Sequence, residues 1–320
     1  MIRPLLLLAL VLLTLFACAH AISITGPFVV TEPGSYHLGA DIVGSGENAV
    51  IELIASDVVI EGDGHTISGG GTDKPGIWVR GSEDRLADRV QINNITVQNC
   101  FYGIHATDVS SLALRQITAR ENLDHGIYLF TVVHSEVSNC TVRDNQGSGI
   151  VISDVSEDNR IEANTVAGND HNGLMLIVSN RNRMLGNTVQ DNGAFGIDCF
   201  MTSHNIIADN FFSNVNNTRV QDLDSNTWSL PVSAGPNIAG GPSRGGNYWG
   251  SSKGRGFSDL TPDADGDGFC DSPYILHGTN IDELPLKGSG NSLPTPTGSP
   301  GFGWLVCLVA LGFALDRGRR

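Results

Sequence analysis

A glycine followed by an aliphatic residue recurs about every 23 residues through the middle of this chain. The pairs are Gly76-Ile77, Gly103-Ile104, Gly126-Ile127, Gly149-Ile150, Gly173-Leu174 and Gly196-Ile197, in steps of 27, 23, 23, 24 and 23. A second aliphatic track keeps the same rhythm at Ile92, Leu114, Val137, Ile161, Met184 and Ile207. Repeats of this length indicate a solenoid or another array of stacked units.

The residues within each repeat indicate β-strands. Three short apolar segments rich in Ile, Val and Thr alternate with Asn, Gly and Asp, and within a segment the apolar residues follow a period of two. Three strands and three turns per repeat predict an all-β parallel β-helix whose coils stack about 4.8 Å apart. Asparagines that keep the same period, such as Asn122, Asn145 and Asn169, are expected to stack at the corners.

The repeated pattern N-T-V-x-x-N followed by G-I-x-I resembles right-handed parallel β-helix repeats. It is most similar to the NosD-like and carbohydrate-binding/sugar-hydrolase (CASH) surface proteins of archaea and bacteria, over Ile22–Leu286. The resemblance implies a right-handed parallel β-helix. It leaves the activity open, because this group includes polysaccharide lyases, epimerases, copper-site maturation proteins and many non-enzymes.

Six segments are predicted along the chain. They are a signal peptide (1–21), an N-terminal cap with the first coil (22–71), the β-helix repeats (72–219), a C-terminal cap (220–288), a Pro/Thr/Gly linker (289–299) and a sorting signal or anchor (300–320). Arg3, the apolar run that follows it and Ala19-His20-Ala21 have the layout of a secretory signal.

The C-terminal stretch resembles the PGF-CTERM sorting signal of archaeal surface proteins. Pro300-Gly301-Phe302 opens an apolar run that ends before a basic tail at Arg317–Arg320. The resemblance implies an archaeosortase that removes the tail and a lipid that then anchors the protein to the cell envelope. An uncleaved membrane anchor is the alternative, and both place the protein outside the cell.

The balance of charge argues against nucleic acid as a partner. Removing the two predicted terminal signals takes away four Arg and one Asp, which leaves 15 basic and 33 acidic side chains and a net charge of −18. Binding of phosphate backbones requires clustered Lys and Arg. The composition suits an exposed surface protein.

Two outward surfaces are candidates for binding a glycan. Two residues after each repeat glycine, the chain places Trp78, His105 and Tyr128, and Phe130 lies two positions beyond Tyr128. Aromatic side chains suit pyranose rings, although the C-terminal segment could cover them instead. On the Thr-containing strand, Arg120 and Arg143 stand one coil apart and could bind the carboxylate of an acidic sugar.

Acid and imidazole side chains in the turns before the repeat glycines are the candidates for catalysis. Asp124-His125 and Asp170-His171 are expected to lie two coils apart, about 10 Å. A lyase or epimerase needs a base near the sugar proton and a group that neutralises the carboxylate. Asp and His are also common turn residues, so the same pairs are compatible with a structural role.

An acidic loop in the predicted C-terminal cap resembles a calcium-binding loop. Asp263, Asp265, Asp267 and Asp271 have alternate spacing, and Gly268 permits a sharp turn. The loop departs from the 12-residue calcium motif at its last position, where Tyr274 replaces Glu, so Asp259 or Asp282 would have to complete the ligand set. A Ca²⁺ ion bound here would be structural, and a hydrogen-bonded acidic turn without an ion is the alternative.

Cysteines and glycosylation motifs complete the sequence features. Cys100, Cys140 and Cys199 fall in three different columns of the stack, which predicts buried thiols rather than disulfides. Asn94, Asn139 and Asn216 each begin an N-x-T motif, which permits glycosylation, and Asn139 is expected to lie too close to the stack to accept it.

Three functions remain open from the sequence. The first is a non-catalytic surface module that binds glycans or associates with the envelope. The second is a polysaccharide lyase or epimerase that acts on acidic polysaccharides. The third is copper handling of the NosD kind, which nine His and four Met, mostly scattered, support weakly.

Overall fold

The computed structural model describes residues 21–82, 84–221 and 226–288. The predicted signal peptide up to residue 20, and the predicted linker and sorting signal at 289–320, lie outside the described residues. Within the described ranges, no helix is long and apolar enough to cross a membrane.

One long sheet of parallel strands carries the repeat glycines. We call it the Gly-Ile sheet, because each regular strand starts just after a repeat glycine. Its strands in order are β2 (Phe28–Val30), β5 (Ile51–Leu53), β8 (Ile77–Arg80), β11 (Ile104–Ser110), β13 (Ile127–Val133), β16 (Ile150–Ser153), β19 (Leu174–Ile177), β22 (Ile197–Phe200) and β25 (Thr218–Gln221), with β9 (Ala87–Asp88) beside β11.

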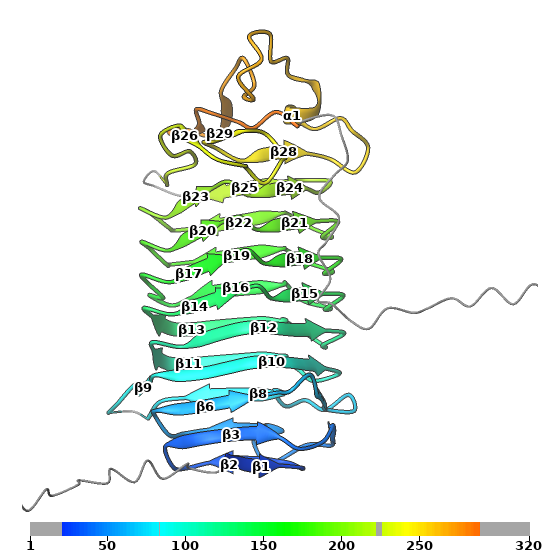
Figure 1. Cartoon of the computed structure of the whole chain (residues 1–320), viewed down its shortest axis with the longest axis vertical. Helices are drawn as coiled ribbons and strands as arrows, with labels where there is room; N and C mark the ends of the chain where they lie inside the picture. The colour runs from blue at the N-terminus through cyan, green and yellow to red at the C-terminus, as the bar shows by residue number, and fades with distance from the viewer. Residues whose placement is uncertain (1–20, 83, 222–225, 289–320) are drawn as a thin grey trace, which may run out of the picture.

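A second sheet contains the other two strand tracks of the repeat. Its main path is β1 (Ile22–Ile24), β3 (Gly34–Leu38), β6 (Val58–Glu61), β10 (Val90–Gln98), β12 (Ala113–Arg120), β15 (Thr141–Arg143), β18 (Thr165–Ala167), β21 (Thr188–Gln190), β24 (Phe211–Ser213) and β28 (Tyr248–Gly250). Beside this path lie β4 (Ile42–Val43), β7 (Thr66–Ser68), β14 (Glu136–Ser138), β17 (Arg160–Glu162), β20 (Arg183–Leu185) and β23 (Ile206–Ala208). The coils stack along the long axis of the molecule (Figure 1).

The pairing register confirms the predicted parallel β-helix. In the Gly-Ile sheet, Ile104 pairs with Ile127, Ile127 with Ile150 and Ile150 with Leu174. These aliphatic side chains are fully or almost fully buried and belong to one continuous core that runs through the stack. Like residues therefore pack on like residues from coil to coil, because each repeat has nearly the same length.

The first 50 residues after the predicted signal belong to the same two sheets as the repeats. β1 pairs with β3 and β3 with β6, while β2 pairs with β5 and β5 with β8. Every pairing is parallel and continues the same sheets. The predicted division at residue 71 therefore has no counterpart in the sheet topology.

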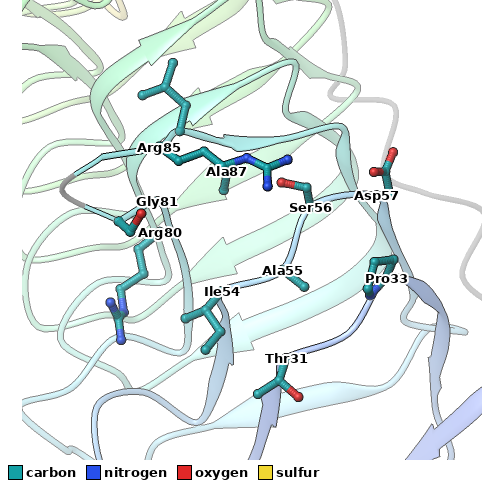
Figure 2. A pocket seen from close by; sticks show the side chains of 12 residues that line it. Thr31, Pro33, Ile54, Ala55, Ser56, Asp57, Arg80, Gly81, Arg85 and Ala87 are labelled. Carbon is teal, nitrogen blue, oxygen red and sulfur yellow. The ribbon is translucent and has the colours of Figure 1, made fainter.

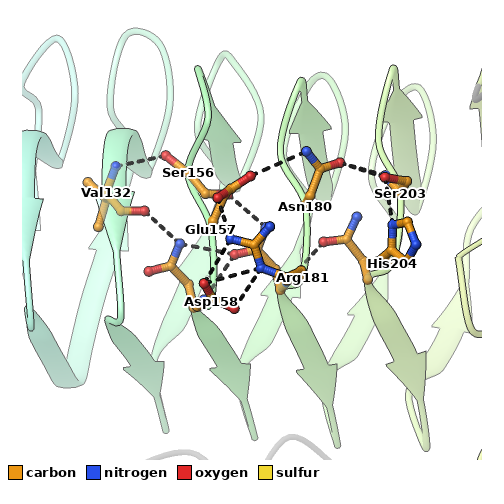
Figure 3. Close-up of polar contacts among 11 residues, drawn as sticks. Val132, Ser156, Glu157, Asp158, Asn180, Arg181, Ser203 and His204 are labelled. Atoms are coloured by element: carbon orange, nitrogen blue, oxygen red, sulfur yellow. Dashed lines mark hydrogen bonds and ion pairs between the residues drawn. The ribbon is translucent and has the colours of Figure 1, made fainter.

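Left-handed backbone and buried asparagines form the corners. Residues at one bend share a positive φ, namely Asn94, Gln116, Asn139, Ala163, Gly186 and Asp209. At other corners, the side-chain oxygen of one Asn accepts a hydrogen bond from the side-chain amide of the Asn one coil earlier. One such ladder contains Asn122, Asn145, Asn169 and Asn192. Figure 3 shows such a corner, where Ser156 and Asn180 bond to neighbouring coils and Arg181 pairs with Glu157 and Asp158.

The C-terminal cap continues the stack from a distant part of the sequence. β28 pairs with β24, so the sequence Gly246-Asn-Tyr-Trp-Gly250 provides a further strand although the repeat spacing has ended. Asn247 extends an asparagine ladder by bonding to Asn210, and Trp249 stacks on Phe212 at 4.8 Å. Above this strand lie β26 (Ser233–Ala234), β27 (Ser243–Arg244), α1 (Phe257–Leu260), β29 (Tyr274–His277) and β30 (Asn280–Asp282).

The cysteines are buried thiols, as predicted. Cys100, Cys140, Cys199 and Cys270 are buried thiols. Burial raises the pKa of Cys100 to about 11 and that of Cys140 to about 12. They are therefore protonated core residues at neutral pH.

Candidate functional site

Three rings stack on the outer face of the Gly-Ile sheet near the N-terminal end of the solenoid. Trp78 on β8, His105 on β11 and Tyr128 on β13 occupy paired positions on adjacent strands. The His105 ring lies 5.8 Å from Trp78 and 5.1 Å from Tyr128, with planes within 5° of parallel. The predicted column therefore exists, but its rings stack on one another instead of lying flat on the sheet.

Rings from the turns before β11 and β13 extend this column sideways. Tyr102 lies 5.1 Å from His105, 5.3 Å from Tyr128 and 5.7 Å from His125. Phe101 contacts Tyr102, and Phe130 contacts Tyr128 edge to face. We call these seven half-buried rings the aromatic patch: Trp78, Phe101, Tyr102, His105, His125, Tyr128 and Phe130.

Sequence analysis missed Phe101 and Tyr102 as members of this patch. The turn residues before successive repeat glycines stack on one another, and Tyr102 in this column lies beneath His125. Tyr102 and His125 each directly precede a repeat glycine. Aligning the residues before the glycines, as well as those after them, would therefore have placed both rings next to the column of Trp78, His105 and Tyr128.

A short polar chain connects Trp78 to His105. The indole N–H of Trp78 donates to Thr107 Oγ1 at 3.3 Å, and Thr107 Oγ1 lies 3.0 Å from His105 Nε2. Burial, together with the nearby His125, lowers the pKa of His105 to about 4. His105 is therefore neutral at pH 7, and the Thr107 hydroxyl can donate its hydrogen to Nε2.

His125 also has a lowered pKa, chiefly because of burial, and His171 contributes to the shift while Asp124 opposes it. The backbone N–H of Ser148 donates to His125 Nδ1 at 3.0 Å, so the neutral ring carries its proton on Nε2. Burial, with smaller contributions from Asp124 and Tyr128, raises the pKa of Tyr102. The patch therefore presents uncharged imidazole and phenol groups.

The two predicted acid–imidazole pairs are not in register with each other. Asp124 lies two residues before its repeat glycine, but Asp170 lies three residues before Gly173. Backbone bonds accordingly place His171 in the column of Asp124 and Gly147, and Asp170 in the column of Gln146. A side chain on Gly147 would collide with Asp124 and His125, so its absence makes room for both groups. The structure brings only Asp124-His125 to the patch.

The predicted arginine surface is separate from the patch. Arg120 and Arg143 pair in register on β12 and β15 of the second sheet. Each is bonded to the acidic residue that follows it, Glu121 and Asp144. The cations that an acidic sugar would require are therefore not beside the imidazoles.

Beyond Tyr128, the outward positions two residues after each repeat glycine are no longer aromatic. Val151 and Asp198 are 2% and 1% exposed although they occupy outward positions, and Asp198 pairs with Arg219. Neighbouring side chains thus cover these two positions, whereas Phe200 on β22 is exposed. The described C-terminal cap sits at the far end of the stack (Figure 1) and does not cover the aromatic patch.

A hollow of about 430 Å³ lies between the first coils and the loop before β9, lined by residues such as Ser56, Asp57 and Arg85 (Figure 2). The Asp57 carboxylate is bonded to Arg89, which is outside this hollow. Its remaining lining is largely aliphatic or small, apart from Arg80, whose Nε donates to Glu52.

The acidic loop brings three of its four predicted residues together. Ligand atoms of Asp263, Asp265 and Asp267 lie within 4.8 Å of one another. Asp271 instead accepts the backbone N–H of Ala264. Asp259 and Asp282 do not complete the set, because Asp259 bonds to Tyr248 and Asp282 to Trp249.

Calcium binding at this loop stays a prediction. Titration calorimetry with Ca²⁺ should detect a site in the native protein that the variant Asp265→Asn weakens at least tenfold, since one carboxylate ligand is lost. Asp271→Asn is the matched control and should retain the affinity. Equal heats in wild type and Asp265→Asn would contradict the prediction.

One protein family matches the greater part of this chain. The family described as "Periplasmic copper-binding protein (NosD)" matches residues 44–254. No curated protein matches the chain.

Solved structures that match include the Azotobacter vinelandii mannuronan C-5 epimerase AlgE4 A-module, at 17% identity and a TM-score of 0.40, covering 63% of this chain and 70% of that one. A point mutant of the periplasmic alginate epimerase AlgG matches at 17% identity and a TM-score of 0.45, covering 77% and 67%. The Dettilon tailspike protein matches at 13% identity and a TM-score of 0.47, covering 74% and 56%.

Proposed function

Since the chain belongs to the NosD family, we propose that it is an exported β-helix protein that binds a surface glycan through the aromatic patch and does not turn it over. The observation that carries this proposal is the patch itself. Seven rings on one face remain half-buried, whereas most aromatic side chains of the cap are enclosed. Contiguous exposed apolar surface on a soluble protein marks a binding site.

The chemistry of the patch suits a sugar. Pyranose rings have apolar C–H faces and polar hydroxyl edges, which match aromatic rings that carry N–H and O–H groups. The patch contains rings in several orientations, because Tyr102 and Phe130 are tilted by 61° and 83° to Tyr128. Hydroxyl groups of the ligand would meet the imidazoles and phenols at the edges of the column.

The electrostatics favour an uncharged glycan. Arg80, the nearest cation, lies 5.1 Å above the Trp78 ring, and its Nε donates to the buried Glu52 at 2.6 Å. The charge of Arg80 is therefore already balanced by the carboxylate of Glu52. The net charge of −18 that remains after removal of the predicted signals would repel an acidic polymer.

A lyase or epimerase acting on acidic sugars is the alternative. The contact between Tyr102 and His125, next to Asp124, offers an acid and a base. That reaction also requires a group that neutralises the sugar carboxylate, and Arg120 and Arg143 lie on the other sheet. The binding function therefore has the stronger support.

Copper, named in the description of the family, does not fit the donors of this chain. The four described cysteines are buried thiols, and burial raises the pKa of Cys100 and Cys270 to about 11 and that of Cys140 to about 12. Within residues 21–82, 84–221 and 226–288, the one group of three clustered His, Cys, Asp or Glu ligands is the acidic loop, which contains no imidazole or sulfur. Copper prefers imidazole, thiolate and thioether ligands.

Export and anchoring belong to the same proposal. The family is described as periplasmic, which supports export. We further propose that an archaeosortase processes the C-terminal signal and that a lipid then holds the protein at the cell envelope. Mass spectrometry of the mature protein would reveal whether residues 300–320 are retained.

The test of glycan binding is a glycan array with the purified mature protein, together with an assay for uronate turnover. Trp78→Ala and Tyr128→Ala should each weaken binding about tenfold or more, because each removes a ring from the patch. Phe200→Ala is the matched control, since Phe200 is an exposed aromatic on β22 of the same sheet but outside the patch. Its affinity should equal that of the wild type.

Two results would overturn the proposal. Unsaturated or stereochemically altered uronates would establish the enzyme instead, and Asp124 and His125 would then be the first residues to change. Equal binding by wild type and both patch variants, with unchanged thermal stability, would show that the patch is not the binding surface.

A further inference from the structure

The three N-x-T motifs coincide with exposed asparagines. Among the described asparagines, the exposed ones are Asn48, Asn94, Asn139 and Asn216, and the last three begin a motif. None of the buried asparagines in the corner ladders precedes a Ser or Thr by two positions. The motifs thus occur where an attached group can reach solvent. The expectation that Asn139 lies too close to the stack is wrong.

Asn94 and Asn139 share one corner column of the solenoid. Both have left-handed backbone, with φ of 49° and 54°, at the bend between two strand segments of the second sheet. Gln116 occupies the same position in the coil between them, so the two amides lie two coils apart, roughly 10 Å. This spacing leaves room for two bulky groups that adjacent coils would not accommodate.

Both motifs open onto the same groove. A recess of about 380 Å³ along this corner is lined by Asn94 and Thr96 of one motif and by Asn139 and Thr141 of the other. The asparagine and the threonine of each motif are therefore accessible from the same side.

The third motif lies on a different edge. Asn216 is in the turn before β25, and its side chain makes one long hydrogen bond, 3.4 Å to the carbonyl of Ala194. Thr218 begins β25 and is partly exposed. Release of one weak bond is a small cost for modification.

We propose that Asn94, Asn139 and Asn216 carry N-linked oligosaccharides. The donor is an oligosaccharide joined to a polyprenyl phosphate carrier. Asparagine Nδ2 forms a bond to the anomeric carbon, the bond from that carbon to the phosphate oxygen breaks, and the lipid phosphate leaves with the electron pair. The proton lost from Nδ2 passes to the medium or to the transferring enzyme, and no redox change occurs.

Two of the proposed glycans lie on a different sheet from the aromatic patch. Asn94 and Asn139 lie on the second sheet, whereas the aromatic patch lies on the Gly-Ile sheet, so their glycans would shield the Thr-lined groove and leave the patch open. This inference rests on the export that the proposed function includes, but not on glycan binding by the aromatic patch, so loss of one result would leave the other standing.

The experiment is glycopeptide mass spectrometry of the full protein purified from the cells that make it. Peptides containing Asn94, Asn139 and Asn216 should carry added hexose masses, and the peptide containing Asn48 should not. Thr96→Val should abolish the modification at Asn94, whereas Thr96→Ser should keep it. Thr141→Val and Thr141→Ser should behave in the same way at Asn139.

The variants are chosen to preserve folding. Valine has the shape and β-branching of threonine, and each asparagine stays in place at its left-handed position. If a valine variant nevertheless fails to fold, the wild-type peptides decide the question. Unmodified masses for all three asparagines in the native protein would overturn the proposal, as would a modification that persists in both valine variants.

Discussion

His105 illustrates how the surroundings of a single residue determine its chemistry. The ring is enclosed between Trp78 and Tyr128, and its Nε2 lies next to the hydroxyl of Thr107. Burial in this position disfavours the charged form, which accounts for the pKa of about 4. The imidazole is thereby held as a neutral aromatic ring.

Acidification should destabilise the protein through this residue. An unfolded histidine takes up a proton near pH 6.5, but folded His105 does so only near pH 4. The unfolded state thus binds more protons between these values, and stability falls as the pH decreases from about 7 to 4. Thermal unfolding midpoints at pH 7 and pH 5 for wild type and His105→Phe measure this contribution.

The variant should lose less stability than the wild type over that range, because phenylalanine keeps the stack and has no proton to bind. His277→Phe is the control, since His277 is exposed on β29. An equal loss of stability in wild type and His105→Phe would contradict the assignment.

For individual residues, the sequence predicted the strand positions of the aromatic patch better than its turn positions. Counting from Gly103 and Gly126 aligned His105 with Tyr128, since strand residues pair in register. The turns contain one residue more or less from coil to coil, so Asp124 and Asp170 appeared equivalent although they are not. Tyr102 aligns with His125 only when the turn residues are counted backwards from each repeat glycine.

The asparagine ladders are the element that holds adjacent coils in register. Asn145 is typical, since its Oδ1 accepts the backbone and side-chain amides of Asn122 while its Nδ2 donates to Ala119 and Asn169. The residue is 1% exposed. Every polar atom of the side chain is therefore satisfied in the absence of water.

Removal of one ladder residue should lower the stability of the fold. Asn145→Ala leaves buried amides of Asn122 without an acceptor, at about 1–3 kcal/mol for each unsatisfied group, so we expect a total loss of roughly 3 kcal/mol. Urea denaturation measures it. Asn216→Ala, at an exposed asparagine whose one hydrogen bond is long, should change stability by less than about 0.5 kcal/mol. A ladder variant as stable as this control would refute the argument.

The elements themselves were largely predictable. The period of 23 residues, the in-out alternation and the corner asparagines all recur in the sequence, because stacking requires each coil to repeat the one below. The final strand at β28 was not predictable, since the chain leaves the repeat at Val220 and returns only at Asn247. Its match to β24 depends on a tertiary contact that spacing does not encode.

At the scale of the whole molecule, the cap closes one end of the solenoid. Trp249 is fully buried, stacks on Phe212 and donates its indole N–H to Asp282 at 2.8 Å. Asp282 is fully buried, and burial raises its pKa to about 6. β28 is thus attached to the repeats by stacking and to the rest of the cap by a buried carboxylate.

Loss of this attachment should expose the upper edge of the sheet. Trp249→Ala should cost about 3–5 kcal/mol, as expected for a large buried aromatic residue. An uncovered edge strand pairs readily with other chains, so the variant should also associate at high concentration. Thermal unfolding and light scattering measure both effects. A monomeric variant with the stability of the wild type would show that the cap is dispensable.

Because the coils repeat at a fixed spacing, the number of coils determines the length of the molecule. The aromatic patch lies on coils near the N-terminal end, and the cap lies at the other end, with regular coils between them. Each coil adds about 4.8 Å along the axis without altering the surface of its neighbours. Gain or loss of whole repeats would therefore change how far the patch stands from the C-terminal end, while the patch itself would stay the same.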